Sequence, residues 1–281
     1  MANNGEMNAV RLVRAVVAAF LCAGAAANVA TTAGANTVRG SCFLLYETGV
    51  GEVRRNPATT CSTRVTPQST FKIPHALAAL DAGVLRDVDT VLKYDGRPVD
   101  FASWRHDHSL SSAMRDSVVW FFQDIATKLG EKRERAYLDR FDYGNRDASS
   151  GLTTFWLGRS LAISPEEQVA FLRRFYAGQL HVAPAATKMV RQILLQPRGK
   201  VTNARGEHPF AAPWPAGTVV AAKTGSGPTG DGGAVRWLVG RVERGSRSWI
   251  FVSNVIANAD APLNAAIELA ERALIAEHVL R

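Results

Sequence analysis

Several features that define other protein classes are scarce in this sequence. Only three cysteines occur among 281 residues, too few for a disulfide scaffold or for a zinc site built from Cys-x-x-Cys pairs. Only one stretch, at the N-terminus, is apolar enough to be considered as a transmembrane segment, so a protein with several membrane spans is excluded. The Gly-x-x-x-x-Gly-Lys-[Ser/Thr] pattern of phosphate-binding loops is absent, and we expect no nucleotide cofactor.

The composition is that of a globular protein with an excess of basic residues. The chain is 47% hydrophobic and 21% charged, with a formal net charge of +8. The basic residues are dispersed, and the densest cluster, Lys132-Arg133-Glu134-Arg135, is interrupted by an acid. We interpret that cluster as a solvated helix face and expect no nucleic-acid partner. His106 and His108 lack further ligands nearby, so we expect surface histidines and no metal.

The N-terminus has the three parts of a secretory signal peptide. Arg11 and Arg14 precede a short apolar run at 15–27, and small residues follow it. The run is shorter than the roughly 20 residues that span a bilayer, which disfavours the alternative of an uncleaved anchor. We predict a signal peptide at 1–27, with a second candidate cleavage site up to residue 35, and a single domain at 28–281. The protein is then exported, with no stable membrane anchor.

Export to an oxidising compartment bears on the two cysteines that remain in the mature chain. Cys42 and Cys61 are readily interpreted as a disulfide there. The alternative is a pair of buried thiols, because free cysteine is among the most buried residue types.

The order of predicted elements indicates an α+β fold. Strands are expected at 41–46, 52–55, 218–223, 236–242 and 249–256, and helices at 71–82, 118–129, 165–177, 185–195 and 263–280. Ser164 and Glu167 form a capping box around Pro165, and Gly178 closes that helix. The pattern predicts an antiparallel sheet formed by both chain ends, packed with helices, beside a mostly helical region.

Ser69-Thr70-Phe71-Lys72 is the first motif that carries chemistry. A serine hydroxyl is a weak nucleophile and needs an adjacent base, and residues three apart on a helix share one face. Lys72 is therefore placed to activate Ser69. Taken alone, the pattern is equally that of a helix N-cap followed by a surface lysine.

Lys223-Thr224-Gly225 is the second motif, at the end of a predicted strand. A lysine and a hydroxyl on an edge strand suit a substrate carboxylate, and glycines let a ligand approach the backbone. Alone, it is also consistent with a strand that runs into a turn.

With these two motifs and three further ones, the sequence resembles the class D serine β-lactamases, a group within the penicillin-recognising serine transferases. The five motifs occur in the family's order: Ser69-Thr70-Phe71-Lys72, Ser117-Val118-Val119, Tyr143-Gly144-Asn145, Phe155-Trp156-Leu157 and Lys223-Thr224-Gly225. The resemblance extends from about residue 40 to the last helix. It implies the β-lactamase-like fold, a β-lactam substrate, a periplasmic location and a role in β-lactam resistance.

The resemblance also implies a role for each motif. Ser69 attacks the β-lactam carbonyl, and Lys72, carbamylated by CO2 or bicarbonate, is the general base for acylation and deacylation. Ser117 relays a proton to the leaving nitrogen. The remaining implied roles are substrate binding by Lys223, Thr224 and Gly225, an oxyanion hole from the backbone N–H groups of Ser69 and Ser226, and carbamate support by Trp156 and Val119. No other cofactor is implied, and the protein is a monomer or a homodimer.

Some of these residues also have simpler structural interpretations. Ser117 can be a helix N-cap, Trp156 a core aromatic, and Tyr143-Gly144-Asn145 a turn, for which we expect a structural role first.

Two features depart from the family. Asn264 follows Pro262-Leu263 where the family often has an arginine that binds the substrate carboxylate, so that task falls on Lys223, Thr224 or a basic residue from elsewhere. The segment 197–217 is longer than expected, and we predict a loop near the cleft.

Three alternatives compete with a β-lactamase. A β-lactam sensor would need membrane spans and a partner domain, and a cell-wall transpeptidase usually has further domains and a polar Ser-x-Asn second motif, where this chain has Val119. A non-catalytic basic binding protein is the third.

Overall fold

The computed structural model describes residues 38–56 and 60–281. The predicted signal peptide at 1–27 and both candidate cleavage sites lie outside the described residues. Among the helices within this range, none combines the length and the apolar character that a membrane crossing requires.

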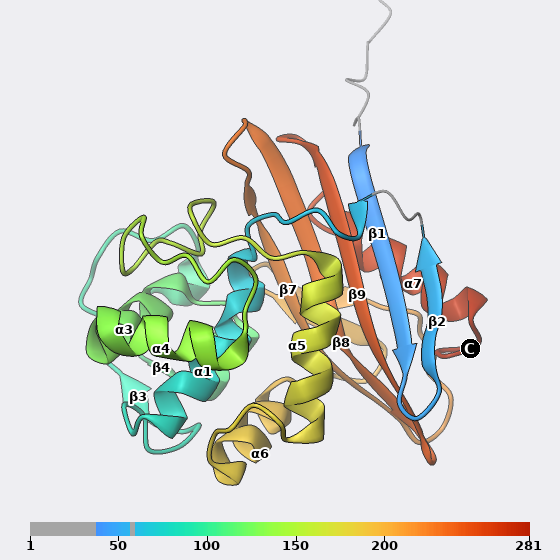
Figure 1. Cartoon of the computed structure of the whole chain (residues 1–281), viewed down its shortest axis with the longest axis horizontal. Helices are drawn as coiled ribbons and strands as arrows, with labels where there is room; N and C mark the ends of the chain where they lie inside the picture. The colour runs from blue at the N-terminus through green and yellow to red at the C-terminus, as the bar shows by residue number, and fades with distance from the viewer. Residues whose placement is uncertain (1–37, 57–59) are drawn as a thin grey trace, which may run out of the picture. The chain divides into compact units, whose positions relative to one another are not determined.

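A five-stranded antiparallel sheet forms the centre of the fold (Figure 1). Its strands, in spatial order, are β2 (Gly51–Asn56), β1 (Val38–Glu47), β9 (Arg247–Asn258), β8 (Gly233–Arg244) and β7 (Thr218–Pro228). Because β1 pairs with β9, strands from both ends of the chain form one sheet, as the sequence predicts. β7 is an edge strand of this sheet, and residues 194–196 pair with part of its outer edge around Ala221.

The remaining elements are helices and two short hairpins. The helices are α1 (Lys72–Asp81), α2 (Leu110–Arg115), α3 (Val119–Leu129), α4 (Glu131–Phe141), α5 (Pro165–Ala177), α6 (Pro184–Ile193) and α7 (Ala265–Ala276), with 3-10 turns η2 (Gln68–Phe71) and η3 (Ala102–Trp104). The hairpins pair β3 (Val91–Leu92) with β4 (His108–Ser109) and β5 (Lys200–Asn203) with β6 (Gly206–Pro209).

Capping residues account for where two of the helices begin and end. The capping box of Ser164 and Glu167 is present at the start of α5, and Gly178 ends that helix in the left-handed region at φ 73°. The last helix is shorter than the predicted 263–280. It begins after Asn264, and His278 at φ 55° breaks the helical path before the chain end.

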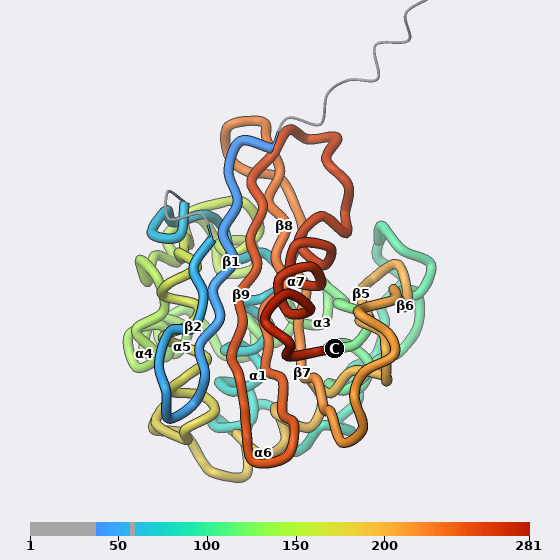
Figure 2. Tube along the Cα trace, turned by 90° about the vertical axis from the view of Figure 1, so that its right-hand side faces the viewer, coloured from blue at the N-terminus to red at the C-terminus, as the bar shows by residue number. Residues whose placement is uncertain are grey.

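Alternation along the central strands creates two hydrophobic cores, one on each face of the sheet. On β8, Trp237 and Val239 belong to the core shared with the helical region, whereas Leu238 and Val242 belong to the core under α7. Figure 2 shows α7 lying over one face of β8 and β9. α1 and α5 lie on the opposite side, so Ser69 and Lys72 are positioned between the helical region and the sheet.

Two expectations about polar residues are correct only in part, since His106 is exposed as expected. Lys132, Arg133 and Arg135 are exposed, but Glu134 is buried and binds Nε2 of buried His75 on α1. His108 is not a surface residue either, since its ring is buried between Ser112 Oγ and the Ser103 carbonyl. The partner of Glu134 comes from another helix, whereas the hydrogen-bond partners of His108 are only four and five residues away.

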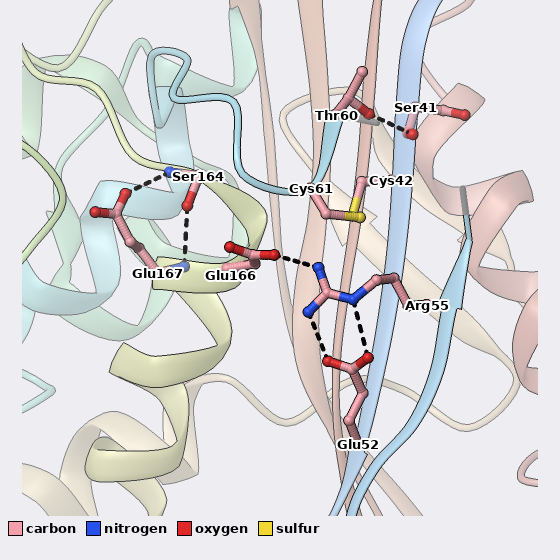
Figure 3. Close-up of a disulfide and its surroundings, with 9 residues drawn as sticks. All are labelled: Ser41, Cys42, Glu52, Arg55, Thr60, Cys61, Ser164, Glu166 and Glu167. Carbon is pink, nitrogen blue, oxygen red and sulfur yellow. Dashed lines mark hydrogen bonds and ion pairs between the residues drawn. A yellow bond between two sulfur atoms is a disulfide. The ribbon is translucent and has the colours of Figure 1, made fainter. Parts of the chain in front are cut away.

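The disulfide between Cys42 and Cys61 is present, with a Cα–Cα distance of 5.2 Å (Figure 3). It links β1 to the segment that leads into η2, next to the start of α5. The alternative of two free thiols is therefore excluded. The same contact region contains an ion pair of Arg55 with Glu52 and Glu166.

Candidate active site

Ser69 and Lys72 lie at the junction of a 3-10 turn and a helix. Ser69 is in η2, and Lys72 is the first residue of α1, one residue later than predicted. Lys72 Nζ donates to Ser69 Oγ at 2.7 Å. The spacing of three therefore brings the two groups together as expected, which excludes the alternative of a surface lysine.

Lys72 lies in an apolar environment. Its side chain is completely buried, and Nζ lies 5.4 Å from the centre of the Phe122 ring. Burial, reinforced by the positive charge of Lys223, holds the pKa of Lys72 well below its ordinary value. The lowered pKa favours the unprotonated amine, the form that acts as a base or reacts with CO2.

The Trp156 ring contacts two aromatic side chains, those of Phe71 and His75, which are close to Lys72 in the sequence. Its ring lies 5.7 Å from Phe71 and 5.1 Å from His75, measured between ring centres. Thr66 Oγ1 donates to the Trp156 carbonyl at 2.9 Å and fixes the loop. The indole Nε1 is buried and has no hydrogen-bond partner. A buried donor without a partner is rare, and this N–H is free to donate to an acceptor that binds beside it.

Lys223 and Ser117 form a second lysine–serine pair. Lys223 Nζ donates to Ser117 Oγ at 3.0 Å and to the Thr224 carbonyl at 3.1 Å. Burial lowers the pKa of Lys223 to about 7, although the charge of Asp116 opposes the shift. Ser117 adopts φ 57° between α2 and α3, and Val118 is the N-cap of α3, so the N-cap interpretation of Ser117 is wrong.

β7 continues well past the lysine motif, and this corrects the predicted strand end at residue 223. Lys223-Thr224-Gly225 lies inside the strand, which runs to Pro228. A Cβ on Gly225 would lie 2.9 Å from the Pro67 carbonyl, and one on Gly227 would overlap the Gln68 side chain. The glycines thus let the edge of the sheet lie directly against η2.

The two pairs border one cleft of about 650 Å³. Ser69 and Ser117 line it from the helical side together with Val119, while Thr224, Gly225 and Ser226 line it from β7. Lys72 is buried behind this surface and contacts one of its lining residues, Ser69. The structure therefore gathers the residues of the three expected catalytic and binding motifs around one opening.

Tyr143, Gly144 and Asn145 have a structural role, because their contacts hold a loop in place. Tyr143 OH accepts from Gln168 Nε2 at 3.2 Å, and burial raises the pKa of this phenol. A Cβ on Gly144 would lie 2.2 Å from the Ala162 carbonyl, and Asn145 Oδ1 accepts from Ala162 N at 3.0 Å. These bonds fix the end of the loop that carries Trp156.

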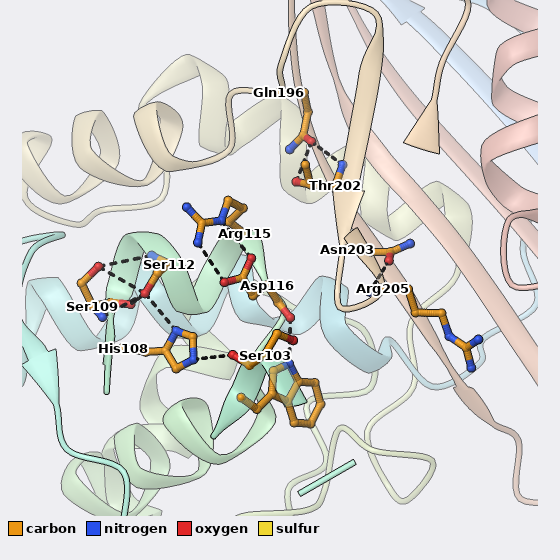
Figure 4. Close-up of polar contacts among 11 residues, drawn as sticks. Ser103, His108, Ser109, Ser112, Arg115, Asp116, Gln196, Thr202, Asn203 and Arg205 are labelled. Carbon is orange, nitrogen blue, oxygen red and sulfur yellow. Dashed lines mark hydrogen bonds and ion pairs between the residues drawn. The ribbon is translucent and has the colours of Figure 1, made fainter. Parts of the chain in front are cut away.

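The predicted loop at 197–217 does lie near the cleft, but part of it forms the β5–β6 hairpin. Asn203, Ala204 and Arg205 at its tip line the opening, and the Arg205 backbone N–H donates to Asn203 Oδ1 (Figure 4). Figure 4 also shows the Asp116 side chain, which accepts two hydrogen bonds from the Arg115 guanidinium.

Arginine residues are the cleft residues that sequence reasoning missed. Arg97, Arg205 and Arg236 all line the opening, and none belongs to a recognised motif. The one signal in the sequence was Asn264, which stands where the family often has a carboxylate-binding arginine. Another basic residue must then take that role. Asn264 itself instead donates to Glu268 at 2.6 Å.

Comparison with known proteins agrees with this geometry. Residues 49–279 match the family model described as penicillin-binding protein transpeptidase domain. The chain is 40% identical to β-lactamase OXA-48 of Klebsiella pneumoniae, over 67% of this chain and 65% of that protein. It is 36% identical to β-lactamase OXA-2 of Salmonella typhimurium, over 78% of this chain and 70% of that protein.

Solved structures give the same result at the level of the fold. The structure of class D β-lactamase BAT-2 is similar at a TM-score of 0.73 and 33% identity, over 86% of this chain and 93% of that chain. The α+β fold is thus that of the penicillin-binding-protein-like enzymes. From its motifs, fold and relatives, the chain belongs to the class D serine β-lactamases.

Proposed function

We propose that this protein hydrolyses the amide bond of β-lactams through an acyl-enzyme on Ser69, with carbamylated Lys72 as general base. The observation that supports this most directly is a completely buried lysine at 2.7 Å from the serine hydroxyl, in apolar surroundings that lower its pKa. A lysine whose neutral form is favoured in this way is suited to react with CO2 and to accept the Ser69 proton.

The residues around Lys72 fit a carbamate. Trp156 has a buried indole N–H with no partner, and an anionic acceptor would satisfy it. Val119, at the start of α3, borders the cleft from the same side. A carbamate supplies a base at the end of a buried lysine, for the serine proton and later for the proton of the hydrolytic water.

Ser117 and Lys223 are proposed to return a proton to the leaving nitrogen. The 3.0 Å hydrogen bond orients the Ser117 hydroxyl, and with a pKa of about 7 Lys223 exchanges a proton readily at neutral pH. The backbone N–H groups of Ser69 and Ser226 are proposed as the oxyanion hole, where negative charge develops on the carbonyl oxygen. Thr224 and Gly225 bind substrate from the edge of β7.

Export, a periplasmic location and a role in β-lactam resistance are part of this proposal. The Cys42–Cys61 disulfide supports export, because disulfides persist mainly in oxidising compartments. N-terminal sequencing of protein recovered from a periplasmic extract would show whether the chain begins after residue 27 or residue 35.

The first experiment is turnover of a simple penicillin by purified protein, with and without added bicarbonate. We expect sustained turnover that increases with bicarbonate and is lost in Lys72→Ala. Lys188→Ala is the matched control, because Lys188 is an exposed lysine on α6 that lines no part of the cleft. It should retain full activity.

Two other outcomes would contradict the proposal. One stoichiometric burst followed by no turnover would identify an acylating sensor or transpeptidase. Acylation of Ser69 can be monitored by mass spectrometry of the intact protein. Its absence would exclude all serine acyl-transfer functions.

A further inference from the structure

Arg236 is a nearly buried cation at the substrate cleft without an acidic partner. The residue is 5% exposed and lines the cleft from β8. Among residues 38–56 and 60–281, no carboxylate lies within ion-pair distance of its guanidinium. Arg97, which lines the same opening, is instead paired with Asp95 and Asp124. A buried charge without a counter-charge is costly, so its retention at a cleft indicates an anionic ligand.

The position of Arg236 on the sheet places it beside the substrate-binding strand. Arg236 is directly opposite Ser226 in the β7–β8 register, and Thr224 lies two residues away on β7. Residues opposite each other on an antiparallel pair project to the same face, with Cβ atoms about 5 Å apart. The guanidinium, the Thr224 hydroxyl and Ser226 therefore share one face at the open edge of the sheet.

Main-chain carbonyls hold the guanidinium in place without neutralising it. Nη2 donates to the Ala261 carbonyl at 2.8 Å, Nε to the Pro262 carbonyl at 3.3 Å, and Nη1 to the Val235 carbonyl at 3.1 Å. A guanidinium has five N–H donors, so one hydrogen on each terminal nitrogen remains for a ligand. Two such donors match the two oxygens of a carboxylate.

A second cation strengthens the positive field. Arg205, at the tip of the β5–β6 hairpin, lines the same cleft (Figure 4), and its charge adds to burial in lowering the pKa of Arg236. Two arginine charges that repel each other across an opening are stabilised when an anion binds between them.

We infer that Arg236 binds the carboxylate of the β-lactam substrate, the task that Asn264 is unable to perform in this chain. The inference rests on the proposed function. Arg236 is a specificity-determining residue at some distance from the reacting bond, with Arg205 as an auxiliary charge. Because such a contact is made equally in the bound ground state and in the transition state, its loss raises KM more than it lowers kcat.

The test compares a penicillin with its carboxyl methyl ester, which has no anionic carboxylate. For Arg236→Gln we expect kcat/KM for the acid to fall about 10- to 100-fold, mainly through KM, and kcat/KM for the ester to change less than about twofold. Wild-type protein that hydrolyses neither compound would contradict the proposed function. Wild-type hydrolysis with an unchanged Arg236→Gln, or with equal losses on acid and ester, would overturn only the inference about Arg236.

Arg244→Gln is the matched control. Arg244 is on the same strand and also donates to main-chain carbonyls, those of His278 and Val279, but it does not line the cleft. Relative to wild type, this variant should change kcat/KM for the acid and for the ester by the same factor. If Arg236→Gln does not fold, Arg236→Lys provides the same comparison, with a smaller loss that is still confined to the acid. Equal losses on both substrates in Arg236→Lys would again overturn the inference.

Discussion

The helical side and the sheet side of the cleft each contribute a buried lysine that donates to a serine, yet the two lysines differ electrostatically. Lys72 Nζ lies over the Phe122 ring, and the charge that shifts its pKa is the positive one of Lys223. Lys223 is buried to a similar degree, but the carboxylate of Asp116 keeps its pKa at about 7. The neighbouring charges thus act in opposite directions: Lys223 lowers the pKa of Lys72, and Asp116 raises the pKa of Lys223.

This difference assigns the chemistry. Lys72, whose pKa is lowered both by burial and by Lys223, is suited to accept a proton or to react with CO2, whereas Lys223, with a pKa of about 7, is suited to hold and transfer a proton. Two groups whose surroundings give them different pKa values divide acid and base roles between them. The following four experiments test that division, from the largest expected effect to the smallest.

Replacing each lysine by arginine should separate the two sides most strongly. Arginine stays protonated in proteins, so it is unable to act as a base or to form a carbamate. Lys72→Arg should therefore reduce kcat/KM for a penicillin by about 100- to 10,000-fold, the range of a lost general base. Lys223→Arg is the matched substitution, and it should lose less activity because a charge remains beside Ser117. Equal losses in the two variants would contradict the division of roles.

Lys223→Met should stabilise the fold while it impairs turnover. The folded pKa of about 7 lies below the ordinary 10.5, so between these values the unfolded chain binds more protons and stability of the wild type rises with pH. Below pH 7 the lysine is charged in both states and the full cost of burial applies. Methionine should therefore raise the free energy of unfolding by roughly 2 to 4 kcal/mol at pH 6, less at pH 9. Denaturant unfolding at both pH values measures this, and a gain that grows with pH would contradict the sign.

Trp156→Phe tests the helical side through its indole N–H. The substitution keeps an aromatic ring and removes the unpartnered donor, so we expect turnover to fall about tenfold and half-maximal activity to need more bicarbonate. Trp214→Phe is the control, because Trp214 Nε1 already donates to the Phe210 carbonyl and Trp214 does not line the cleft. It should lose stability and keep its bicarbonate response. An unchanged bicarbonate response in Trp156→Phe would exclude the role proposed for Trp156.

Asp116→Asn should have the smallest effect. Removing this carboxylate removes the charge that opposes the shift, so the pKa of Lys223 should fall further, and the pH profile of turnover should move in the acidic direction. The Asp116 side chain is partly exposed and paired with Arg115, which limits the change. NMR titration of labelled lysine side chains would measure the shift. A rise in the pKa of Lys223 would show that Asp116 does not act on it as described.

Motif spacing predicted the reactive pair well because the contact is local. Lys72 follows Ser69 by three residues, and a helical turn brings such residues together whatever packs around them. The α5 capping box was equally predictable, since Ser164 and Glu167 bind each other's backbone within one turn. The pairing of β1 with β9 was expected from strand order and hydrophobic pattern.

Non-local contacts account for the expectations that were wrong. Glu134 is charged and lies among basic residues, so nothing local indicated that it would be buried against His75. The hydrogen-bond partners of His108, Ser112 and Ser103, are close in sequence, but its ring also lies 5.9 Å from the ring of Trp120 on α3, measured between ring centres. Arg236 looked like an ordinary strand residue, and only its register with Ser226 places it at the cleft.

The sequence by itself therefore determined the reacting groups, the order of the elements and the family, because these depend on residue identity and short spacings. Tertiary structure alone decided the electrostatics. The pKa values of Lys72 and Lys223, the unpartnered indole of Trp156 and the unpaired charge of Arg236 all depend on which distant segments exclude water from them. Desolvation is a property of the assembled packing, and no local pattern of residues encodes it.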